Sequence, residues 1–347
     1  MKVVVLMGGR SSEREISLRT GHGIAQALRN LGHEVLAIDA ADGRAIAAAE
    51  KASAQLEGPF ERGGLPEISV AAVADTEALA EADVVFVALH GGAGENGTIQ
   101  ALLDLAGRPY TGSGVMASAV AMNKAMSKRV FERVGVPTPR WQLVREDRPE
   151  PVDAAAMGGY PLIVKPNEEG STVGLSVVNG AGELPAALAM AFEFGRDALV
   201  EEFIPGRELT VAVAGDEAYP IVEIRPNSGH YDYESKYTSG ASEYFCPADL
   251  PEPLARRIEE LAVRAARAID CAGVSRVDFR LSPNNEPSCL ELNTIPGMTP
   301  TSLVPMAARA KGLNYDQLVA RMLELALEEW RRRQPRAARG SGTRQAS

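Results

Sequence analysis

Residues 274–293 read VSRVDFRLSPNNEPSCLELN, and this stretch predicts two β-strands joined by a tight turn. Apolar and polar residues alternate in Val274–Leu281 and again in 288–292, as they do in half-buried strands. Pro283-Asn284-Asn285 stands between the two runs, and proline and asparagine both favour turns. We therefore expect an antiparallel hairpin whose polar residues face one another.

The polar residues of this hairpin have the composition of a metal site. Side chains alternate between the two faces of a strand, so Arg276 and Asp278 share one face of the first strand. Glu291 and Asn293 share a face of the second strand for the same reason. Two carboxylates and an amide oxygen that converge suit Mg²⁺, whose remaining ligands come from phosphates and water. The alternative is a polar face in solvent, but the apolar residues interleaved with these four favour a site.

The N-terminal part of the chain has the pattern of an open α/β sheet. Lys2–Met7 is an apolar run typical of a strand buried on both faces, and Gly8-Gly9 follows it directly. A helical pattern of apolar residues runs over 16–31, preceded by the capping-box spacing of Ser12 and Glu15. Further strands are predicted at 34–38 and 83–89, and a further helix at Thr98–Leu105. In such a sheet the loops at the carboxyl ends of the strands carry the chemistry.

The rest of the chain divides into two further units and a tail. One continuous helix is predicted over 116–134, and Pro137 and Pro139 beyond it mark a hinge. Later strands are predicted at 161–166, 175–178, 198–203, 209–214 and 221–224, and later helices at 183–194 and 252–269. We place the units at residues 1–122, 123–208 and 209–330. Residues 331–347 carry almost no apolar side chains, which predicts a disordered tail.

Composition and charge exclude several classes of protein. The chain has 347 residues, 45% of them apolar and 24% charged, which suits a folded protein with a large core. It has 46 acidic and 36 basic side chains, and the net charge of −10 argues against binding to nucleic acid. The sequence has no apolar run near the roughly 20 residues that span a bilayer. We therefore expect no membrane partner. The three cysteines, Cys246, Cys271 and Cys289, lack the spacing of disulfide pairs or metal sites, so we expect free thiols and a cytoplasmic protein.

Charged residues outside the hairpin fit a phosphate site. Lys165 ends an apolar strand and precedes the loop NEEGSTVG, residues 167–174. Backbone N–H groups of such a loop can bind phosphate oxygens while the lysine supplies positive charge, although the pattern is not that of a P-loop. A plain hairpin turn explains the loop equally well. Lys124, Glu201 and Glu208, each taken alone, fit a surface lysine or a solvated acidic edge.

Six segments, taken in order, resemble the D-alanine:D-alanine ligase family of the ATP-grasp superfamily. The resemblance covers nearly the whole chain, to about residue 328. The segments are GGRSSERE (8–15), LHGGAGENG (89–97), YTGSG (110–114), KP (165–166) with EGSTVG (169–174), YDYE (231–234) with KY (236–237), and ELNTIPGMT (291–299).

The resemblance implies an α/β protein with three domains of the ATP-grasp type. These are an N-terminal open parallel α/β domain (1–122), a central ATP-grasp subdomain (123–208) and a C-terminal domain with the metal and catalytic residues (209–330). Such ligases phosphorylate the carboxylate of one D-alanine with ATP, and the amine of a second D-alanine attacks the acyl phosphate. The product, D-alanyl-D-alanine, serves peptidoglycan synthesis. The implied partners are ATP, two D-alanine molecules and two Mg²⁺ ions, with Mn²⁺ as an alternative; a monovalent cation and a homodimer stay open.

The resemblance also assigns roles in the reaction. Arg276 would stabilise the oxyanion of the tetrahedral intermediate beside the main-chain N–H of Gly297. Asp278, Glu291 and Asn293 would hold the two Mg²⁺ ions. Glu201 and Glu208 would bind the adenine and ribose of ATP, and Lys165 would lie near the adenine as well as the phosphates. The full set of residues that would contact ATP is Lys124, Lys165, Ser171, Glu201, Glu208 and Lys236.

Further roles concern the two D-alanine molecules. Glu13 would receive the ammonium group of the first D-alanine, with His90 and Glu95 near the same subsite. Ser302 and Leu303 would border the second D-alanine. Ser171 and Tyr237 would hydrogen-bond with Glu13 and tie mobile loops over the closed site. For two of these residues a plainer reading stays open: His90 as a capped histidine at a strand end, and Glu95 as a loop charge.

The chain departs from the family pattern at three positions, and related activities remain as alternatives. Asn96 stands where aspartate is usual, Thr172 where serine is frequent, and Arg10 where a small hydroxyl residue is common. The alternatives are a D-alanine:D-lactate or D-alanine:D-serine ligase, another ATP-grasp carboxylate–amine ligase, and a nucleotide-binding protein without activity. Tyr237 argues against the lactate form, Glu13 against a more distant ligase, and the three predicted metal ligands against a silent protein.

Overall fold

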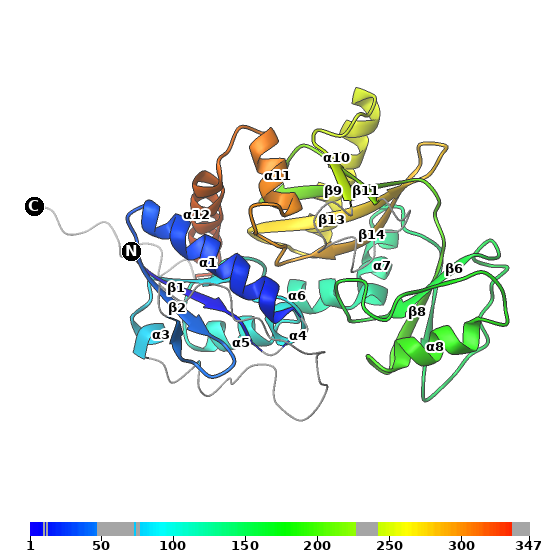
Figure 1. Ribbon diagram of the computed structural model, residues 1–347, viewed down its shortest axis with the longest axis horizontal. Coiled ribbons are helices and arrows are strands. Elements are labelled where there is room, and N and C mark those ends of the chain that lie inside the picture. The colour runs from blue at the N-terminus through cyan, green and yellow to red at the C-terminus, as the bar shows by residue number, and fades with distance from the viewer. Residues whose placement is uncertain (10, 12, 47–72, 74–76, 227–241, 335–347) are drawn as a thin grey trace, which may run out of the picture.

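In the computed structural model, three β-sheets with flanking helices follow one another along the chain (Figure 1). The structure describes all residues except 10, 12, 47–72, 74–76, 227–241 and 335–347. The first sheet lies at one end of the long axis, the second at the opposite end, and the third between them. The mixed α/β class predicted from the sequence is confirmed.

The first sheet is mainly parallel, as predicted. Its strands are β1 (Lys2–Met7), β2 (Glu34–Asp39), β3 (Ala45–Ile46) and β4 (Val84–Val87), in the order β3-β2-β1-β4. β1 pairs in parallel with β2 and β4, whereas the two-residue β3 is antiparallel to β2. The helices of this part are α1 (Arg14–Asn30), α3 (Glu77–Glu81), α4 (Gly92–Glu95) and α5 (Thr98–Leu105). Since parallel strands end at the same edge, the loops that follow β1 and β4 meet there.

Hydrogen bonds tie these two loops together. Ser17 Oγ donates to the carbonyl oxygen of Ala88 at 2.7 Å, and Ser11 Oγ donates to that of His90 at 2.6 Å. The predicted capping box at the start of the first helix is wrong: the N-cap of α1 is Glu13, whose side chain makes no capping hydrogen bond, and Ser12 lies outside the described residues. The Glu13 carboxylate is therefore placed by the loop rather than by the helix end.

An ion pair holds the loop that carries Glu13. Arg14 forms a two-pronged contact with Asp39 at the end of β2, and Arg14 Nη1 also donates to the carbonyl oxygen of Gly9 at 2.6 Å. Asp39 Oδ1 in turn accepts from the N–H groups of Gly9 at 3.1 Å and Ala41 at 2.9 Å. These contacts fix Gly9 and Arg14 against the end of β2, and Arg14 is the residue next to Glu13.

The single helix predicted over 116–134 is wrong, because the chain breaks it in two. The helices are α6 (Val115–Met122) and α7 (Lys124–Arg133). Asn123 between them has extended backbone angles, and its side chain accepts a hydrogen bond from the N–H of Met126 at 3.0 Å. Asparagine often caps helices because its side chain satisfies an N–H group that the first turn leaves unpaired. The break places Lys124 in the first turn of α7.

The second sheet is antiparallel. Its strands are β5 (Trp141–Arg145), β6 (Leu162–Pro166), β7 (Ser176–Val178) and β8 (Asp197–Glu202), in the order β5-β8-β6-β7. Helix α8 (Leu184–Phe192) packs on one face with Ala187 and Ala191 in the buried core. The predicted β6–β7 hairpin around residues 167–174 is confirmed by the pairing of Leu162 with Val178.

The third sheet contains the hairpin of residues 274–293. Its strands are β9 (Arg207–Ala214), β10 (Glu217–Ala218), β11 (Val222–Pro226), β12 (Ser242–Phe245), β13 (Val274–Leu281) and β14 (Pro287–Asn293). The order is β12-β11-β9-β13-β14, with β10 beside β9. Helix α10 (Glu252–Ala268) covers this sheet through Ile258, Ala262 and Ala265, which are fully buried. The three cysteines are free, as predicted.

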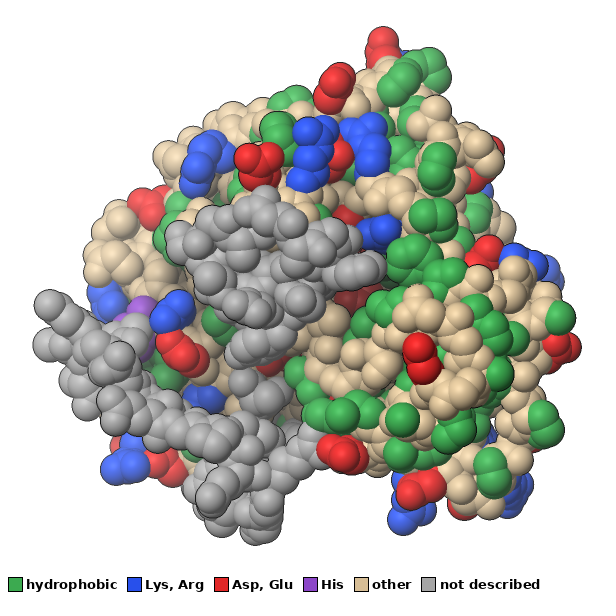
Figure 2. Space-filling view, turned by 45° about the vertical axis from the view of Figure 1, so that its right-hand side comes forward, with side chains coloured by type: hydrophobic (Ala, Val, Ile, Leu, Met, Phe, Trp, Pro, Cys, Tyr) green, Lys and Arg blue, Asp and Glu red, His purple; other side chains and the backbone are tan. Residues whose placement is uncertain are grey.

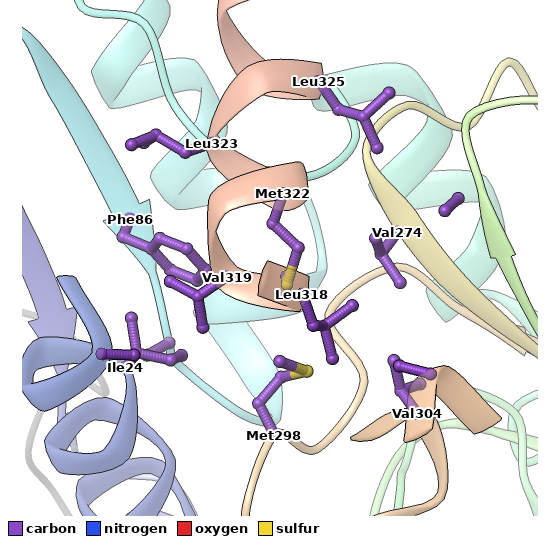
Figure 3. Packing of buried hydrophobic residues seen from close by; sticks show 14 of the residues in the cluster. Ile24, Phe86, Val274, Met298, Val304, Leu318, Val319, Met322, Leu323 and Leu325 are labelled. Carbon is purple, nitrogen blue, oxygen red and sulfur yellow. The ribbon is translucent and has the colours of Figure 1, made fainter. Parts of the chain in front are cut away.

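The last two helices join the third sheet to the first. They are α11 (Leu303–Ala310) and α12 (Tyr315–Arg333). Leu318, Val319 and Met322 of α12 pack between Ile24 and Phe86 on one side and Val274 and Val304 on the other (Figure 3). Since one apolar cluster includes residues of both ends of the chain, the N-terminal domain and the third sheet share a core.

The prediction of a disordered tail from residue 331 is wrong for its first residues. Arg331, Arg332 and Arg333 belong to α12, and residues 335–347 lie outside the described part of the chain. Glu329 accepts hydrogen bonds from both Arg332 and Arg333, and Arg333 Nη1 donates to the Tyr110 hydroxyl at 2.8 Å. Basic residues are favourable in the last turn of a helix, where the helix dipole is negative.

Two surface observations complete the fold. Acidic and basic side chains are intermixed on the face drawn in Figure 2, so the described residues of that face form no continuous basic stripe. Among the helices that the structure describes, none is long and apolar enough to cross a bilayer.

Candidate active site

A cavity of about 640 Å³ is lined by residues of the second and third sheets, of the loops beside them, and of the loops and helices that follow β1 and β4. Every predicted site residue that the structure describes lines it. These residues are Glu13, His90, Glu95, Lys124, Lys165, Ser171, Glu201, Glu208, Arg276, Asp278, Glu291, Asn293, Gly297, Ser302 and Leu303. Tyr237 and Lys236 lie outside the described residues. Segments that are far apart in the sequence therefore converge on one cavity.

The hairpin of β13 and β14, called the carboxylate hairpin below, is antiparallel, as predicted. Asp278 pairs directly with Glu291, and Arg276 pairs with Asn293. Arg276 forks onto Asp278, with Nε 2.9 Å from Oδ1 and Nη2 2.7 Å from Oδ2. Asn293 Nδ2 donates to Asp278 Oδ2 at 3.2 Å, and Thr210 of β9 donates to Oδ1. The Asp278 carboxylate is thus fixed in place by three neighbours.

The donor set of the carboxylate hairpin fits a magnesium ion shared with a phosphorylated ligand. Asp278 and Glu291 offer carboxylate oxygens on adjacent strands, and Asn293 offers an amide oxygen beside them. Among the described residues, no group of three or more His, Cys, Asp or Glu side chains is placed to hold a metal ion by itself. Mg²⁺ commonly binds to one or two carboxylates and takes its other ligands from phosphates and water.

A buried triad of two lysines and one glutamate lies at another part of the cavity. Glu201, at 2% exposure, lies 2.9 Å from Lys165 Nζ through one oxygen and 2.8 Å from Lys128 Nζ through the other. Lys128 is fully buried and also donates to Thr138 Oγ1 at 2.7 Å. The triad was predicted only in part, because Lys128 does not stand out in the sequence.

The charges of the triad stabilise one another. Burial alone would raise the pKa of Glu201, but Lys128 and Lys165 outweigh it and hold that pKa below its ordinary value. Burial would lower the pKa of Lys165, but Glu201 and Glu291 outweigh it and raise it. For Lys128, burial dominates and lowers the pKa despite Glu201. An anionic Glu201 beside a cationic Lys165 can accept a hydrogen bond from an amino group while the lysine binds an anion.

Lys124 joins the glycine-bearing loop to the carboxylate hairpin. Its Nζ donates to the carbonyl oxygen of Glu169 at 2.6 Å and lies 3.6 Å from Glu291 Oε2. The loop has an unusual backbone, because Ser171 (φ 50°) and Thr172 (φ 64°) both adopt left-handed angles that residues other than glycine rarely take. Such strain is typical of functional loops whose surroundings hold them in place.

The loop brings Ser171 to Glu13, as the resemblance implied. Ser171 Oγ donates a hydrogen bond to Glu13 Oε1. Glycines make room for this carboxylate: a Cβ at Gly91 would lie 3.0 Å from Glu13 Oε2, and one at Gly170 would lie 3.2 Å from it. Gly91 also has φ +73°, which excludes most other residues. The arrangement leaves a carboxylate in the cavity that can bind a cationic amino group.

His90 and Glu95 lie beside Glu13 and are not solvated loop residues. His90 is 5% exposed, its Nε2 lies 3.2 Å from Thr20 Oγ1, and burial lowers its pKa so that the ring is neutral. Glu95 Oε2 accepts from the N–H of Gly91 at 2.8 Å. Burial, together with the nearby charge of Glu13, raises the pKa of Glu95 to about 8. At neutral pH Glu95 is therefore mostly protonated.

The segment after the carboxylate hairpin completes the cavity. Ser302 Oγ accepts from the N–H of Thr299 at 3.0 Å and lies 2.7 Å from Thr299 Oγ1. A Cβ at Gly297 would lie 3.1 Å from Ser302 Oγ, so only a glycine fits there without a shift. Ser302 is the N-cap of α11 and Leu303 its first residue, which places the positive end of a helix dipole at the cavity.

Comparison with known proteins decides the family. A family model described as the D-ala D-ala ligase N-terminus matches residues 2–113, and one described as the D-ala D-ala ligase C-terminus matches residues 130–324. The chain belongs to the D-alanine–D-alanine ligase family. The resemblance drawn from six segments, and the ATP-grasp fold that it implied, are confirmed.

Individual members of the ligase family match over most of their length. A D-alanine–D-alanine ligase of Syntrophotalea carbinolica is 45% identical over 322 residues, which cover 93% of this chain and 95% of that protein. One of Bordetella petrii is 45% identical, with 91% and 89% covered. The crystal structure of D-alanine–D-alanine ligase from Bacillus anthracis complexed with ATP is 28% identical, with a TM-score of 0.76, and the match covers 96% of this chain and 100% of that one.

The structure adds residues to the ligase site that the sequence did not single out. Lys128 stands four residues after Lys124, a spacing that places both on one side of α7 and is the only signal for it. Arg280 follows Asp278 by two residues on the same strand face, so alternation points to it. Thr210 carries no signal, because only the pairing of β9 with β13 brings it to Asp278. Asn96, a departure from the family pattern, still forms a local hydrogen bond, since its Oδ1 accepts from the N–H of Thr98 at 3.0 Å at the start of α5.

Proposed function

We propose that this chain joins two D-alanine molecules to D-alanyl-D-alanine in a reaction that converts ATP to ADP and phosphate, as its family relatives are named for doing. The observation that carries the proposal is the single cavity that holds both the carboxylate hairpin and Glu13. One part has the chemistry to bind phosphates, and the other has the chemistry to bind an amino acid. An enzyme that phosphorylates the carboxylate of an amino acid needs both together.

The nucleotide would lie along the buried triad. Glu201 would accept the exocyclic amino group of adenine, and Glu208 would bind the ribose. Lys165 and Lys124 would bind phosphate oxygens, with Ser171 and the N–H groups of its loop beside them. The carboxylate hairpin would hold two Mg²⁺ ions through Asp278, Glu291 and Asn293, and these ions neutralise phosphate charge when they are bound.

The two D-alanine molecules would meet between Glu13 and Ser302. The carboxylate of Glu13 would hold the ammonium group of the first D-alanine, with His90 and Glu95 beside it. The first carboxylate would take the terminal phosphoryl group of ATP to give D-alanyl phosphate. Ser302 and the N-terminus of α11 would bind the carboxylate of the second D-alanine. Its amine would attack the carbonyl carbon, and collapse of the tetrahedral intermediate would expel phosphate.

Arg276 would act at the tetrahedral intermediate. Its guanidinium is held by the fork to Asp278, so it needs no rearrangement when negative charge develops on the carbonyl oxygen. The main-chain N–H of Gly297 would be the second donor. Tyr237 and Lys236 keep the roles given in the sequence analysis as proposals, and so do the division at residues 122 and 208, the cytoplasmic location and a homodimer.

The experiment is an assay of phosphate release with ATP and each of three acceptors. D-alanine is tested alone, with D-serine and with D-lactate, and the products are identified by mass spectrometry. We expect ADP, phosphate and D-alanyl-D-alanine in equal amounts, with little mixed product. The proposal fails if saturating D-alanine and Mg-ATP give no dipeptide. A predominance of D-alanyl-D-lactate or D-alanyl-D-serine would assign the chain to one of the alternative ligases.

A further inference from the structure

Arg280 is a charged residue of the cavity to which the proposed reaction gives no role. On β13 the partly exposed positions alternate with buried ones, and Arg276, Asp278 and Arg280 are the three charged members of the exposed face. The Arg280 side chain lines the cavity and is 15% exposed. It therefore belongs to the same face as the predicted metal ligand Asp278, one position further along.

The guanidinium of Arg280 touches three parts of the nucleotide end of the cavity. Its Nε donates to the carbonyl oxygen of Ile204 at 3.0 Å, and its Nη1 lies 3.3 Å from Glu208 Oε2. Its central carbon lies 6.0 Å from the centre of the Phe203 ring. The strand register places Arg280 directly opposite Glu208 on β9, so the ion pair follows from the backbone pairing.

These contacts lie where the second sheet joins the third. Phe203 and Ile204 belong to the short connection between β8, which carries Glu201, and β9, which carries Glu208. A guanidinium has several N–H groups in a rigid plane, so it can hold a backbone carbonyl and a carboxylate at once. A lysine in its place has one nitrogen on a flexible chain and cannot keep both directions fixed.

We propose that Arg280 is a positioning residue that sets the orientation of Glu208 and of the 203–204 connection for binding the ribose and adenine. This inference rests on the proposed function, which places the nucleotide at Glu201 and Glu208. Arg280 also offsets the charge of Glu208, which would otherwise add negative potential to a cavity that must accept phosphates. Arg280 therefore acts on nucleotide binding, whereas Arg276 and the carboxylate hairpin act in the chemical step.

The test measures binding of ADP, 2′-deoxy-ADP and 3′-deoxy-ADP by calorimetry in the presence of Mg²⁺. Wild type is compared with Arg280→Met and Arg280→Lys. The matched control is Arg257→Met, which removes an exposed arginine of α10 that pairs with Glu286 at 2.9 Å. Thermal melting of each variant shows whether the fold is kept, and the lysine variant provides the test if the methionine variant unfolds.

We expect Arg280→Met to weaken ADP binding about tenfold, as the loss of hydrogen bonds between charged groups does. One of the two deoxy nucleotides lacks the hydroxyl that Glu208 binds, and it should bind wild type more weakly than ADP does. Arg280→Met should reduce the affinity for that nucleotide less than it reduces the affinity for ADP. Arg280→Lys should fall between wild type and Arg280→Met, and Arg257→Met should match wild type. In turnover, KM for ATP should rise while kcat stays close to that of wild type.

Three results would overturn the inference. One is unchanged ADP binding by a folded Arg280→Met, and another is an equal loss for all three nucleotides. The third is wild-type protein that binds the three nucleotides equally or not at all, since Arg280 then has no ribose contact to support. A failure of the proposed function gives a different result. In that case the protein makes no dipeptide but still binds ADP and still binds one deoxy-ADP more weakly than ADP.

Discussion

The buried triad predicts that one substitution changes the sign of its effect when a second is present. Lys128→Met removes a fully buried ammonium group that contacts Glu201 at 2.8 Å and Thr138 at 2.7 Å. When this is the only substitution, Glu201 keeps Lys165 as its one remaining partner in the triad, 2.9 Å away. We expect this change to lower the free energy of unfolding by about 2 kcal/mol, since one charged hydrogen bond and one charge partner are lost.

Glu201→Gln is expected to be more damaging. It leaves two lysines close together without the carboxylate that compensates them, and Lys128 has no contact with solvent. Breaking a buried ion pair by removing one partner typically costs about 3–5 kcal/mol, because an uncompensated charge remains buried. Lys165 lines the cavity and can be solvated there, so the larger part of this loss belongs to Lys128.

The double variant decides between this explanation and simple loss of packing. In the Glu201→Gln background, Lys128→Met replaces an unpaired buried charge by an apolar side chain of similar length. We therefore expect it to restore about 1–3 kcal/mol there, whereas it costs about 2 kcal/mol in wild type. The measurement is urea denaturation of the four proteins without nucleotide, followed by circular dichroism and tryptophan fluorescence.

The matched control is Lys2→Met. Lys2 forms an ion pair of 2.8 Å with Glu81, but both side chains are about half exposed, so the loss should stay below about 1 kcal/mol. The reasoning is refuted if Lys128→Met costs the same in both backgrounds, because the three side chains would then contribute independently.

Two further predictions concern the amino-acid end of the site. Arg276→Ala should lower kcat by about 100- to 1000-fold, the typical loss for one oxyanion donor, with ATP affinity by calorimetry close to that of wild type; parallel losses of affinity and turnover would make Arg276 a nucleotide-binding residue. Glu95 keeps its proton to about pH 8 in the folded chain but releases it near 4.5 when unfolded. Its contribution to stability therefore falls as pH rises between these values, and from pH 6 to pH 8 wild type should lose about 2 kcal/mol relative to Glu95→Gln in urea denaturation. Parallel stability curves would contradict this.

The sequence predicts those parts of the site in which local geometry fixes the outcome. Alternation along the two strands around the turn at Pro283-Asn284-Asn285 is enough to place Arg276 with Asp278 and Glu291 with Asn293. Hairpin length alone does not predict the pairing of Asp278 with Glu291, because a regular hairpin that continued the pairs next to the turn would place Leu290 opposite Asp278. The β-bulge between Asp278 and Phe279 shifts the register by one residue, and this shift brings Glu291 opposite Asp278.

Prediction fails where a polar side chain interrupts a regular pattern. The apolar and basic residues over 116–134 continue the helical spacing through Asn123, so the pattern predicts one helix. Whether an asparagine side chain bonds to the backbone and begins a new helix depends on the local competition between two hydrogen bonds, and composition does not decide it. The same holds at residues 331–333, where polarity indicates disorder but Glu329 and Tyr110 supply partners for the arginines.

Charge pairing at the site depends on contacts between residues far apart in the chain. Lys128 is one charged residue in a helix rich in them, and a lysine in such a helix is usually exposed. Its buried ammonium group has a partner in Glu201 of β8, more than 70 positions later, at 2.8 Å. The sequence contains both residues, but nothing in their spacing relates one to the other.

The same limit applies to the electrostatics of the cavity as a whole. A net charge of −10 suggests a chain that repels ATP, and the cavity itself is lined by several carboxylates. In the structure four of these carboxylates have cations beside them: Glu201 has Lys165 at 2.9 Å, Asp278 has Arg276 at 2.7 Å, Glu208 has Arg280 at 3.3 Å, and Glu291 has Lys124 at 3.6 Å. Each pair is nearly neutral at the distance of an incoming phosphate, and the second lysine of the triad adds a positive charge. The paired carboxylates therefore add little negative potential, and a polyphosphate can enter a cavity whose residue composition alone argues against it.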